Sequence, residues 1–595
     1  MQVGLQAIRR VWTCARRSDW RGWLVPGHRV WSAPAESRND FLLRLTHSRQ
    51  RSSGGSLENV AMKEAYDIIV AGAGSAGCVL ANLLSENAGT RVLLLEAGGH
   101  DWNPLVSIPL GARKLLDWGW YHWDDWSEPD LTLNGRRQRV PHGKIVGGTS
   151  SINFMAHVRG HPADYADWVR RGAESWSYEA LLPFFRQCER WLPGADAWRG
   201  GNGSISAEPS ALRDPIAQSW FAAIDGLGLP RTADYNGEHP EGFGPMQYSV
   251  GHGRRSSAAS AYLKPALSRR NLRLLTRATV TRVLFDGRRA IGVEYLRAGR
   301  TRRAFCSDRL VLSMGAINTP HVLMLSGIGP ADHLRQFGIN PVLDLPVGKS
   351  LEDHLGFFVE WERRDLDPFH ASLRLDRIAI NMIRAYLRRT GPAAHLPGSI
   401  GGFLRTRPDL TAPDLQFLIP FISPSANVWL PGQNVRSLGE FAVKVQLTSQ
   451  RSRGEVKLAS ADLRKRPVIA YNSLSDAHDL EVLRRGFRIA QALGNSPALA
   501  AYRKGPKNPD RVLEQDGEID SFIRATAIQQ YHPAGTCAMG SGNQAVLTNE
   551  LKVRGSANLF VVDASAMPRL ISGNPNIVVS MMAARAVDLW RRPTL

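Results

Sequence analysis

Cysteine is scarce in this chain, and its copies are scattered. The 595 residues contain five, namely Cys14, Cys78, Cys188, Cys306 and Cys537. No C-x-x-C pair and no cysteine/histidine cluster at metal-ligand spacing occurs. This pattern excludes a disulfide framework and a zinc-finger type of site, so we expect no metal and a reducing compartment.

Long apolar runs and internal repeats are also absent. No stretch of about 18 apolar residues occurs, so a transmembrane helix is not expected. The 43% hydrophobic and 22% charged residues are typical of a folded enzyme. Because a single core stops growing near ~250–300 residues, the chain predicts two or more domains.

The net charge of +20 raises the question of an anionic partner. Zinc-finger, RNA-binding and basic-zipper patterns are missing, so nucleic acid is not expected. A diffusely basic surface is the simpler interpretation, with weak attraction to anionic lipid and hence peripheral membrane association as an option.

Residues 1–62 differ from the rest of the chain. They hold ten arginines, no lysine and four acidic residues, a net charge of 10 − 4 = +6. Such a segment is typical of a mitochondrial transit peptide. The alternative is an over-extended start of a bacterial protein whose natural start is Met62, in which case we expect a cytoplasmic or membrane-peripheral protein.

The segment "YDIIVAGAGSAGCVLANLLSENAGTRVLLLEAGG" predicts a β-α-β unit from Tyr66 onward. Its G-x-G-x-x-G turn permits close approach of a pyrophosphate at a helix N-terminus. Glu96 follows the last turn glycine by 19 residues, where a carboxylate binds a ribose hydroxyl, and this argues against a 2′-phosphate. The unit therefore predicts NAD or FAD, with contacts from Gly72, Gly74, Ser75, Ala76, Gly77, Glu96 and Ala97.

Several later motifs resemble those of the glucose-methanol-choline (GMC) oxidoreductases, closest to the choline dehydrogenase and FAD-dependent alcohol dehydrogenase branch. They are "GKIVGGTSSINFMAHVRG" at 143–160, "GAINTPHVLMLSGIG" at 315–329, "YHPAGTCAMG" at 531–540 and "VVDASAMP" at 561–568. The resemblance implies an α/β fold, with a Rossmann-like FAD domain interleaved with a substrate domain on a mostly antiparallel sheet. We expect an N-terminal FAD region at 63–362, a substrate or lid segment at 363–450 and a C-terminal catalytic region at 451–590.

The same resemblance assigns further FAD contacts. They are Gly147, Gly148, Thr149, Ser150, Asn153, Val280, Asp563, Ala564 and Asn574. Covalent members carry a histidine just before the asparagine of the first signature, where this chain has Ile152. Non-covalent FAD is therefore expected.

Oxidation of an alcohol needs a base for the hydroxyl proton, and histidine is the usual choice. His532 matches the family's catalytic base, although a lone histidine is more often structural. Asn574 stands where the family has its second polar residue, and its amide can hold the substrate oxygen. Gly-Asn-Pro is also ordinary turn chemistry, so a turn role for Asn574 stays open.

The function implied is oxidation of a primary alcohol to an aldehyde, with hydride transfer to flavin N5 and electrons passed to a quinone or another acceptor. Choline or an aliphatic or aromatic alcohol is the candidate substrate. The alternatives are an oxidase that uses O2, a lyase and a non-catalytic flavin-binding protein. The tryptophans at 118, 120, 123 and 126 predict packing at a lid in preference to a cage for a quaternary ammonium.

Overall fold

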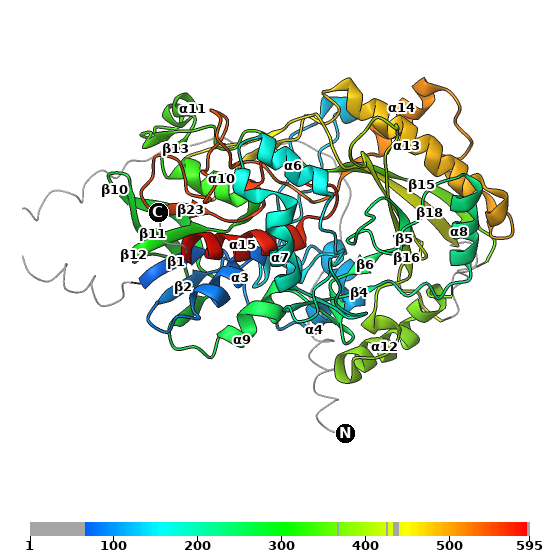
Figure 1. Cartoon of the computed structure of the whole chain (residues 1–595), viewed down its shortest axis with the longest axis horizontal. Coiled ribbons are helices and arrows are strands. Elements are labelled where there is room, and N and C mark those ends of the chain that lie inside the picture. Colours follow the sequence, from blue (N-terminus) through cyan, green and yellow to red (C-terminus); the bar gives the residue numbers. More distant parts are fainter. Residues whose placement is uncertain (1–65, 366–367, 424–425, 432–438, 592–595) are drawn as a thin grey trace, which may run out of the picture. The chain divides into compact units, whose positions relative to one another are not determined.

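The computed structural model describes residues 66–365, 368–423, 426–431 and 439–591. The arginine-rich extension expected at 1–62 and Cys14 lie outside the described residues. Two seven-stranded sheets organise the described part of the chain (Figure 1).

The first sheet contains the predicted β-α-β unit. Strand β1 (Tyr66–Ala71) lies parallel to β2 (Val92–Leu95), and α3 (Ser75–Leu84) connects them. The strand order is β10-β11-β12-β1-β2-β9, with β23 paired to β12. The other strands are β9 (Leu272–Leu275), β10 (Thr279–Asp286), β11 (Arg289–Arg297), β12 (Arg300–Leu312) and β23 (Leu559–Val561).

Helices cover both faces of this sheet. Helix α15 (Asn576–Arg591) packs on α3 and on α7 (Tyr178–Cys188), as the red, blue and cyan ribbons show (Figure 1). Helix α10 (Gly315–Leu325) packs against β10, and nearly all of its side chains are buried. Most of the motif at 315–329 is therefore a buried helix, and the short strand β13 (Ile328–Gly329) follows it.

The second sheet is antiparallel, with the order β21-β15-β18-β17-β16-β5, and β22 also pairs with β15. Its strands are β5 (Gly242–Pro245), β15 (Leu355–Arg363), β16 (Ser399–Leu404), β17 (Leu415–Pro420), β18 (Glu440–Leu447), β21 (Arg503–Asn508) and β22 (Ile528–Gln529). Alternation along each strand sends one set of side chains to a hydrophobic core and the other set to the opposite face.

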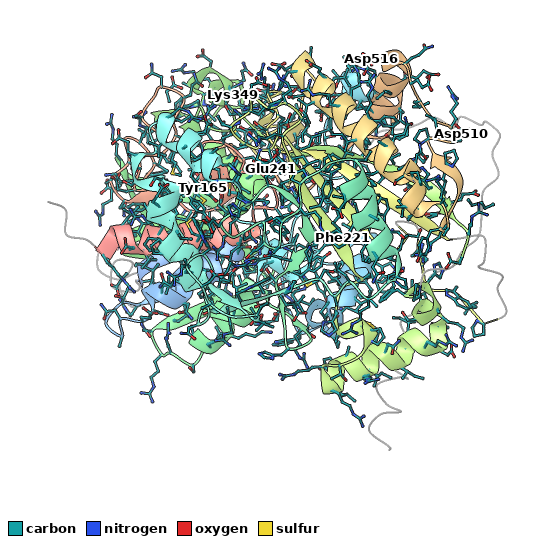
Figure 2. All side chains as sticks on the ribbon, turned by 45° about the vertical axis from the view of Figure 1, so that its right-hand side comes forward. Tyr165, Phe221, Glu241, Lys349, Asp510 and Asp516 are labelled. Atoms are coloured by element: carbon teal, nitrogen blue, oxygen red, sulfur yellow. The ribbon has the colours of Figure 1, made fainter. Side chains whose placement is uncertain are left out.

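Three helices bury the apolar face of the second sheet. They are α8 (Ile216–Gly226), α13 (Ala477–Asn495) and α14 (Asp516–Thr526). Asp516 at the start of α14 forms ion pairs with Arg484 and Arg488 of α13, at the upper edge of Figure 2. This layer leaves the other face of the sheet for the site described below.

The chain passes between the sheets more than once. Strand β5 joins the second sheet before β9 to β12 complete the first, and β23 with α15 returns to the first at the end. The predicted fold class, an α/β nucleotide domain interleaved with a domain on an antiparallel sheet, is confirmed. None of the helices in the described ranges combines the length and apolar character needed to cross a membrane.

Candidate active site

One large cavity, of about 1490 Å³, has walls from both sheets. The turn between β1 and α3 forms one end, and the exposed face of β17 and β18 forms the other. Ordinary small-molecule pockets span ~300–1,000 Å³, so this cavity has room for a dinucleotide and a second, smaller molecule.

Two glycine turns from distant parts of the sequence meet at the nucleotide end. Gly147 donates its N–H to the Ala73 carbonyl at 2.7 Å. A Cβ on Gly148 would lie 2.8 Å from the Gly74 Cα, and Gly148 has a positive φ of 53°. Only glycine permits this approach, which leaves a cradle of backbone with little side-chain bulk.

Most of the predicted cofactor residues line the cavity. These are Gly72, Gly74, Ser75, Ala76, Glu96, Ala97, Gly148, Thr149, Asn153, Val280, Asp563, Ala564 and Asn574. Gly77, Gly147 and Ser150 are not among the lining residues. These three residues support the residues that line the cavity. A Cβ on Gly77 would lie 1.9 Å from the carbonyl oxygen of the lining residue Gly72, and Ser150 Oγ donates to the Gly147 carbonyl at 2.6 Å.

Glu96 lies at the end of β2 with its carboxylate fixed by backbone. Its two oxygens accept hydrogen bonds from the N–H groups of Ala73, at 2.9 Å, and Gly98, at 2.7 Å. Burial raises the pKa of Glu96 to about 7, against the two hydrogen bonds and Lys144, which lower it. The carboxylate thus stands at the adenosine end, where the sequence predicts a ribose contact.

Polar groups in the cavity wall fit a flavin dinucleotide. Asp563 is buried and accepts from Gly315 N at 2.8 Å and Thr319 Oγ1 at 2.6 Å, so it holds the start of α10 in place. Ser313 Oγ and the ring nitrogens of His321 are buried beside the cavity without a hydrogen-bond partner among the described residues. A bound polar ligand would satisfy such groups.

Two helix N-termini meet at the same end of the cavity. Ser75, the first residue of α3, donates from Oγ to Asn576 Oδ1 at the start of α15, at 2.7 Å. Both residues line the cavity. Because helix N-termini carry partial positive charge and open N–H groups, this end is suited to a diphosphate.

His532 lies where the cavity meets the second sheet, and its neighbours define its tautomer. His354 Nε2 is 3.1 Å from the Ile571 carbonyl, which can only accept, so Nε2 carries the hydrogen. Burial lowers the pKa of His354 to about 3, so this ring is neutral and its Nδ1 is an acceptor. His532 Nδ1 is 2.9 Å from that atom and must be the donor. The lone pair of His532 is therefore on Nε2.

The remaining contacts of His532 complete this arrangement. Its backbone N–H donates to Asp353 Oδ1 at 2.8 Å. Burial, the neighbouring His354 and Lys444 lower the pKa of His532 well below its usual 6.5. The imidazole is thus neutral near pH 7, with an unprotonated Nε2 that can take a proton.

Asn574 faces that nitrogen from the turn before α15. Its Nδ2 donates to His532 Nε2 at 2.9 Å, and its Oδ1 accepts from Gln416 Nε2 at 3.4 Å. Gln416 in turn accepts from Gln446 Nε2 at 2.8 Å. The two glutamines on β17 and β18 therefore orient the Asn574 amide with its donor toward His532. Asn574 precedes α15 and its amide faces His532, while its contact with a substrate oxygen stays a prediction.

Four residues of this site escape the sequence interpretation: His354, Lys444, Gln416 and Gln446. His354 ends the segment "LEDH" at 351–354, where two acids precede a buried strand, and that signal could have singled it out. The other three come from strands whose alternation predicts only the sheet.

The tryptophan segment does not form one cluster. The rings of Trp118 and Trp120 lie 4.7 Å apart, whereas Trp123 stacks on His142 at 6.1 Å. Trp126 is half exposed. Cations already occupy Trp123: Lys144 Nζ is 4.2 Å and the Arg466 guanidinium 4.5 Å from its ring centre.

Two further residues have structural roles. Cys537 is fully buried, and burial with nearby Asp563 raises the pKa of its thiol well above the usual value, so it is no nucleophile. His157 packs inside the molecule and contacts Glu189 Oε1 at 2.8 Å and Ser249 Oγ at 3.0 Å.

The chain is similar to known proteins over most of its length. Two family models described as GMC oxidoreductase match residues 66–356 and 450–583. "Choline dehydrogenase, mitochondrial" of Mus musculus is 40% identical over 542 residues, 89% of each chain. "Oxygen-dependent choline dehydrogenase" of Vibrio vulnificus is 37% identical over 535 residues, 89% of this chain and 94% of its own.

Solved structures agree over a similar span. Pyridoxine 4-oxidase from Mesorbium loti superposes with a TM-score of 0.79 at 29% identity, covering 89% of this chain and all of its own. An FAD-dependent oxidoreductase from Chaetomium thermophilum has a TM-score of 0.80 at 25% identity, covering 88% of this chain and 99% of its own.

Proposed function

The chain is a member of the GMC oxidoreductase family, and from this premise we propose that it oxidises a primary alcohol to an aldehyde with bound FAD. The observation that carries the proposal is the unprotonated Nε2 of a neutral His532, which accepts a hydrogen bond from the Asn574 amide at the cavity wall. The curated relatives named choline dehydrogenases place choline among the alcohols to be tested.

His532, Asn574 and His354 have different roles in the proposed oxidation. Bound FAD supplies the hydride acceptor. The substrate hydroxyl lies beside His532 Nε2 and Asn574 Nδ2, within hydrogen-bond reach of both, and replaces the bond between them. Nε2 then receives the hydroxyl proton while Nδ2 donates to the oxygen. His354 holds the tautomer, because its Nδ1 accepts from His532 throughout.

The glycine turns at Gly74 and Gly148, the carboxylate of Glu96 and the N-termini of α3 and α15 would hold FAD.

The attachment of FAD is proposed to be non-covalent, because the side chain of Ile152, a buried residue that lines the cavity, offers no atom for a covalent bond. Acid precipitation of the holoprotein should release all the yellow colour into the supernatant. Colour retained in the pellet would contradict this.

The electrons are proposed to pass to a quinone or a similar acceptor. Exposed helix α12 (Leu375–Arg388) supports attachment to a membrane surface, where quinones reside. It carries a stripe of exposed Ile380, Ile383 and Leu387, flanked by Arg384 and Arg388. An apolar stripe beside arginines is typical of an interfacial helix. Leu375 and Met382 of the same helix line the cavity.

The proposed function is tested by mixing purified holoprotein with primary alcohols, choline included, without oxygen. Loss of the visible flavin band with an alcohol, abolished in His532→Ala that still holds FAD, would support both the reaction and the base. A protein that stays yellow with every alcohol would favour a lyase or a flavin-binding protein. Oxygen consumption during turnover would then separate an oxidase from a dehydrogenase.

A further inference from the structure

A lysine in the substrate half of the cavity forms no ion pair with any carboxylate of the described residues. Lys444 lies in the middle of β18 and lines the cavity together with His532. It pairs directly with Phe358 on β15 and with Leu418 on β17, and all three side chains face the cavity. Directly paired residues lie on one face of a sheet, so apolar groups flank the lysine stem on both sides.

The ammonium group of Lys444 makes no hydrogen bond and no ion pair with any described residue. Its Nζ is 6.0 Å from the centre of the Phe358 ring. The carboxylates on the same sheet face are engaged elsewhere: Glu440 pairs with Lys507, and Glu360 bonds the Asn508 side chain. Asp353 accepts the His532 N–H and does not line the cavity.

Four carboxylates are among the described residues that line the cavity, and none of them pairs with Lys444. Glu96 and Asp563 belong to the nucleotide end, where they accept backbone N–H groups. Asp117 pairs with Arg113 at 2.8 Å and with Lys114 at 3.5 Å. Asp124 is exposed in the loop after Trp123.

The two tryptophans among the described lining residues, Trp118 and Trp123, do not form a cage for a cation. The Trp123 ring already has two cations against it, and Lys114 lies 5.9 Å from the Trp118 ring centre. A quaternary ammonium would therefore enter a space that holds an unpaired cation and offers it no free tryptophan face. Like charges in a partly desolvated site repel strongly.

From this arrangement we infer that Lys444 selects a primary alcohol bearing a carboxylate or another anionic group, and selects against choline. The inference rests on the proposed function and narrows its substrate class. Burial lowers the pKa of Lys444 to about 8, with Asp353 opposing the shift, so the group stays mostly charged at pH 7. The unpartnered ammonium is thus available to bind the anionic end while His532 and Asn574 hold the hydroxyl.

The test compares three alcohols that differ in charge: choline, its neutral isostere 3,3-dimethylbutan-1-ol, and ω-hydroxy carboxylates of increasing chain length. With the native holoenzyme, kcat/KM should be highest for one of the hydroxy acids and lowest for choline. Lys444→Met, which keeps the length of the side chain, should lower kcat/KM for the hydroxy acid at least about tenfold, mainly through KM. The loss for the neutral alcohol should be at least about threefold smaller than the loss for the hydroxy acid.

A charge-reversal variant and a binding measurement test the same inference. Lys444→Glu should raise kcat/KM for choline relative to the hydroxy acid. If this variant does not hold FAD, the comparison relies on Lys444→Met. Binding of butanoate and of tetramethylammonium, followed through the flavin spectrum, should favour butanoate only when Lys444 is present. Choline used as well as the neutral isostere, or equal losses on all three alcohols in Lys444→Met, would overturn the inference.

The two proposals fail in different ways. If neutral alcohols bleach the flavin without any charge ranking, the substrate inference is wrong and the alcohol oxidation stands. If no alcohol of any charge bleaches it, the proposed function is wrong, and the binding of butanoate against tetramethylammonium still decides the role of Lys444.

Discussion

His532 owes its tautomer to a residue 178 positions earlier in the chain. His354 is neutral because it is buried, its Nε2 donates to a carbonyl, and its remaining lone pair fixes the hydrogen of His532 on Nδ1. In many enzymes a third group orients the catalytic base, and here His354 orients the His532 ring. In the proposed reaction, His354 is therefore a positioning residue that acts through His532.

Replacing His354 tests this role. His354→Phe removes the acceptor and keeps a ring of similar size, so kcat should fall about 10- to 100-fold, part of what a positioned base contributes. Steady-state kinetics over a pH range, with the flavin content checked, measures the effect. His333→Phe, at a histidine that does not line the cavity, is the matched control and should leave kcat unchanged. Equal kcat in native protein and His354→Phe would refute the role.

The acid limb of the pH profile should reflect the lowered pKa of His532. A base works in its neutral form, and burial, His354 and Lys444 all disfavour the charged form, so the neutral form persists below pH 6.5. We expect kcat/KM for a neutral alcohol to stay level as the pH falls to about 6.5 and to decline only below it. A decline that is half complete above pH 6.5 would contradict this assignment.

At the scale of elements, the turn between β1 and α3 combines two requirements for glycine. A Cβ on Gly77 would lie 1.9 Å from the Gly72 carbonyl oxygen, so helix and strand could not keep their contact. At Gly74, with a φ of −79°, a Cβ would meet only the Ser313 carbonyl oxygen at 3.8 Å, but it would project beside the cavity.

These two glycines make a matched pair of variants. Gly77→Ala should destabilise even the apoprotein, by about 1–3 kcal/mol, because it overpacks a helix–strand contact. Gly74→Ala should leave the thermal midpoint of the apoprotein unchanged and weaken FAD binding. Thermal unfolding of the apoproteins and FAD titration measure both effects. Equal thermal midpoints and equal FAD affinities in the two variants would show that Gly77 and Gly74 do not have these separate roles.

Helix α12 makes a prediction at the same scale. The double substitution Ile383→Glu and Leu387→Glu places charge on the exposed apolar stripe, so binding to vesicles containing phosphatidylserine should drop at least about fivefold. Val512→Glu, at an exposed apolar residue of another segment, is the control and should bind as the native protein does. Co-sedimentation with the vesicles measures the bound fraction of each protein. Native protein that stays in the supernatant would refute membrane attachment.

At the scale of the whole molecule, the cavity joins the two sheets. Its walls include the turn after β1, the histidine and asparagine of the C-terminal segment, and β17 with β18. A ligand that fills it contacts both halves of the interleaved fold, so binding and stability are linked.

Removal of FAD should therefore lower the thermal midpoint markedly. A ligand at 1,000 times its Kd stabilises by about 4 kcal/mol, and the apoprotein lacks this contribution. Unfolding of holoprotein, apoprotein and apoprotein with FAD restored should show a loss and its recovery. Apoprotein as stable as holoprotein would mean that the cavity is not filled by FAD.

Local spacing within the sequence determines the nucleotide unit. Gly72, Gly74, Gly77 and Glu96 lie within one β-α-β unit, and the alternation of residues 278–296 predicts the hairpin of β10 and β11. The pattern that marks His532 as a candidate base is also contained in a few consecutive residues. Such signals depend on covalent geometry and short-range hydrogen bonds, which is why they are legible without the fold.

Only the tertiary structure decides which residues meet. The contact of His354 with His532 and the glutamine pair behind Asn574 bring together residues separated by long stretches of chain. On their strands, Gln416, Lys444 and Gln446 look like ordinary members of an alternating pattern. Their roles arise from sheet register and burial, which set neighbours, dielectric environment and tautomer, and these are properties of the folded molecule.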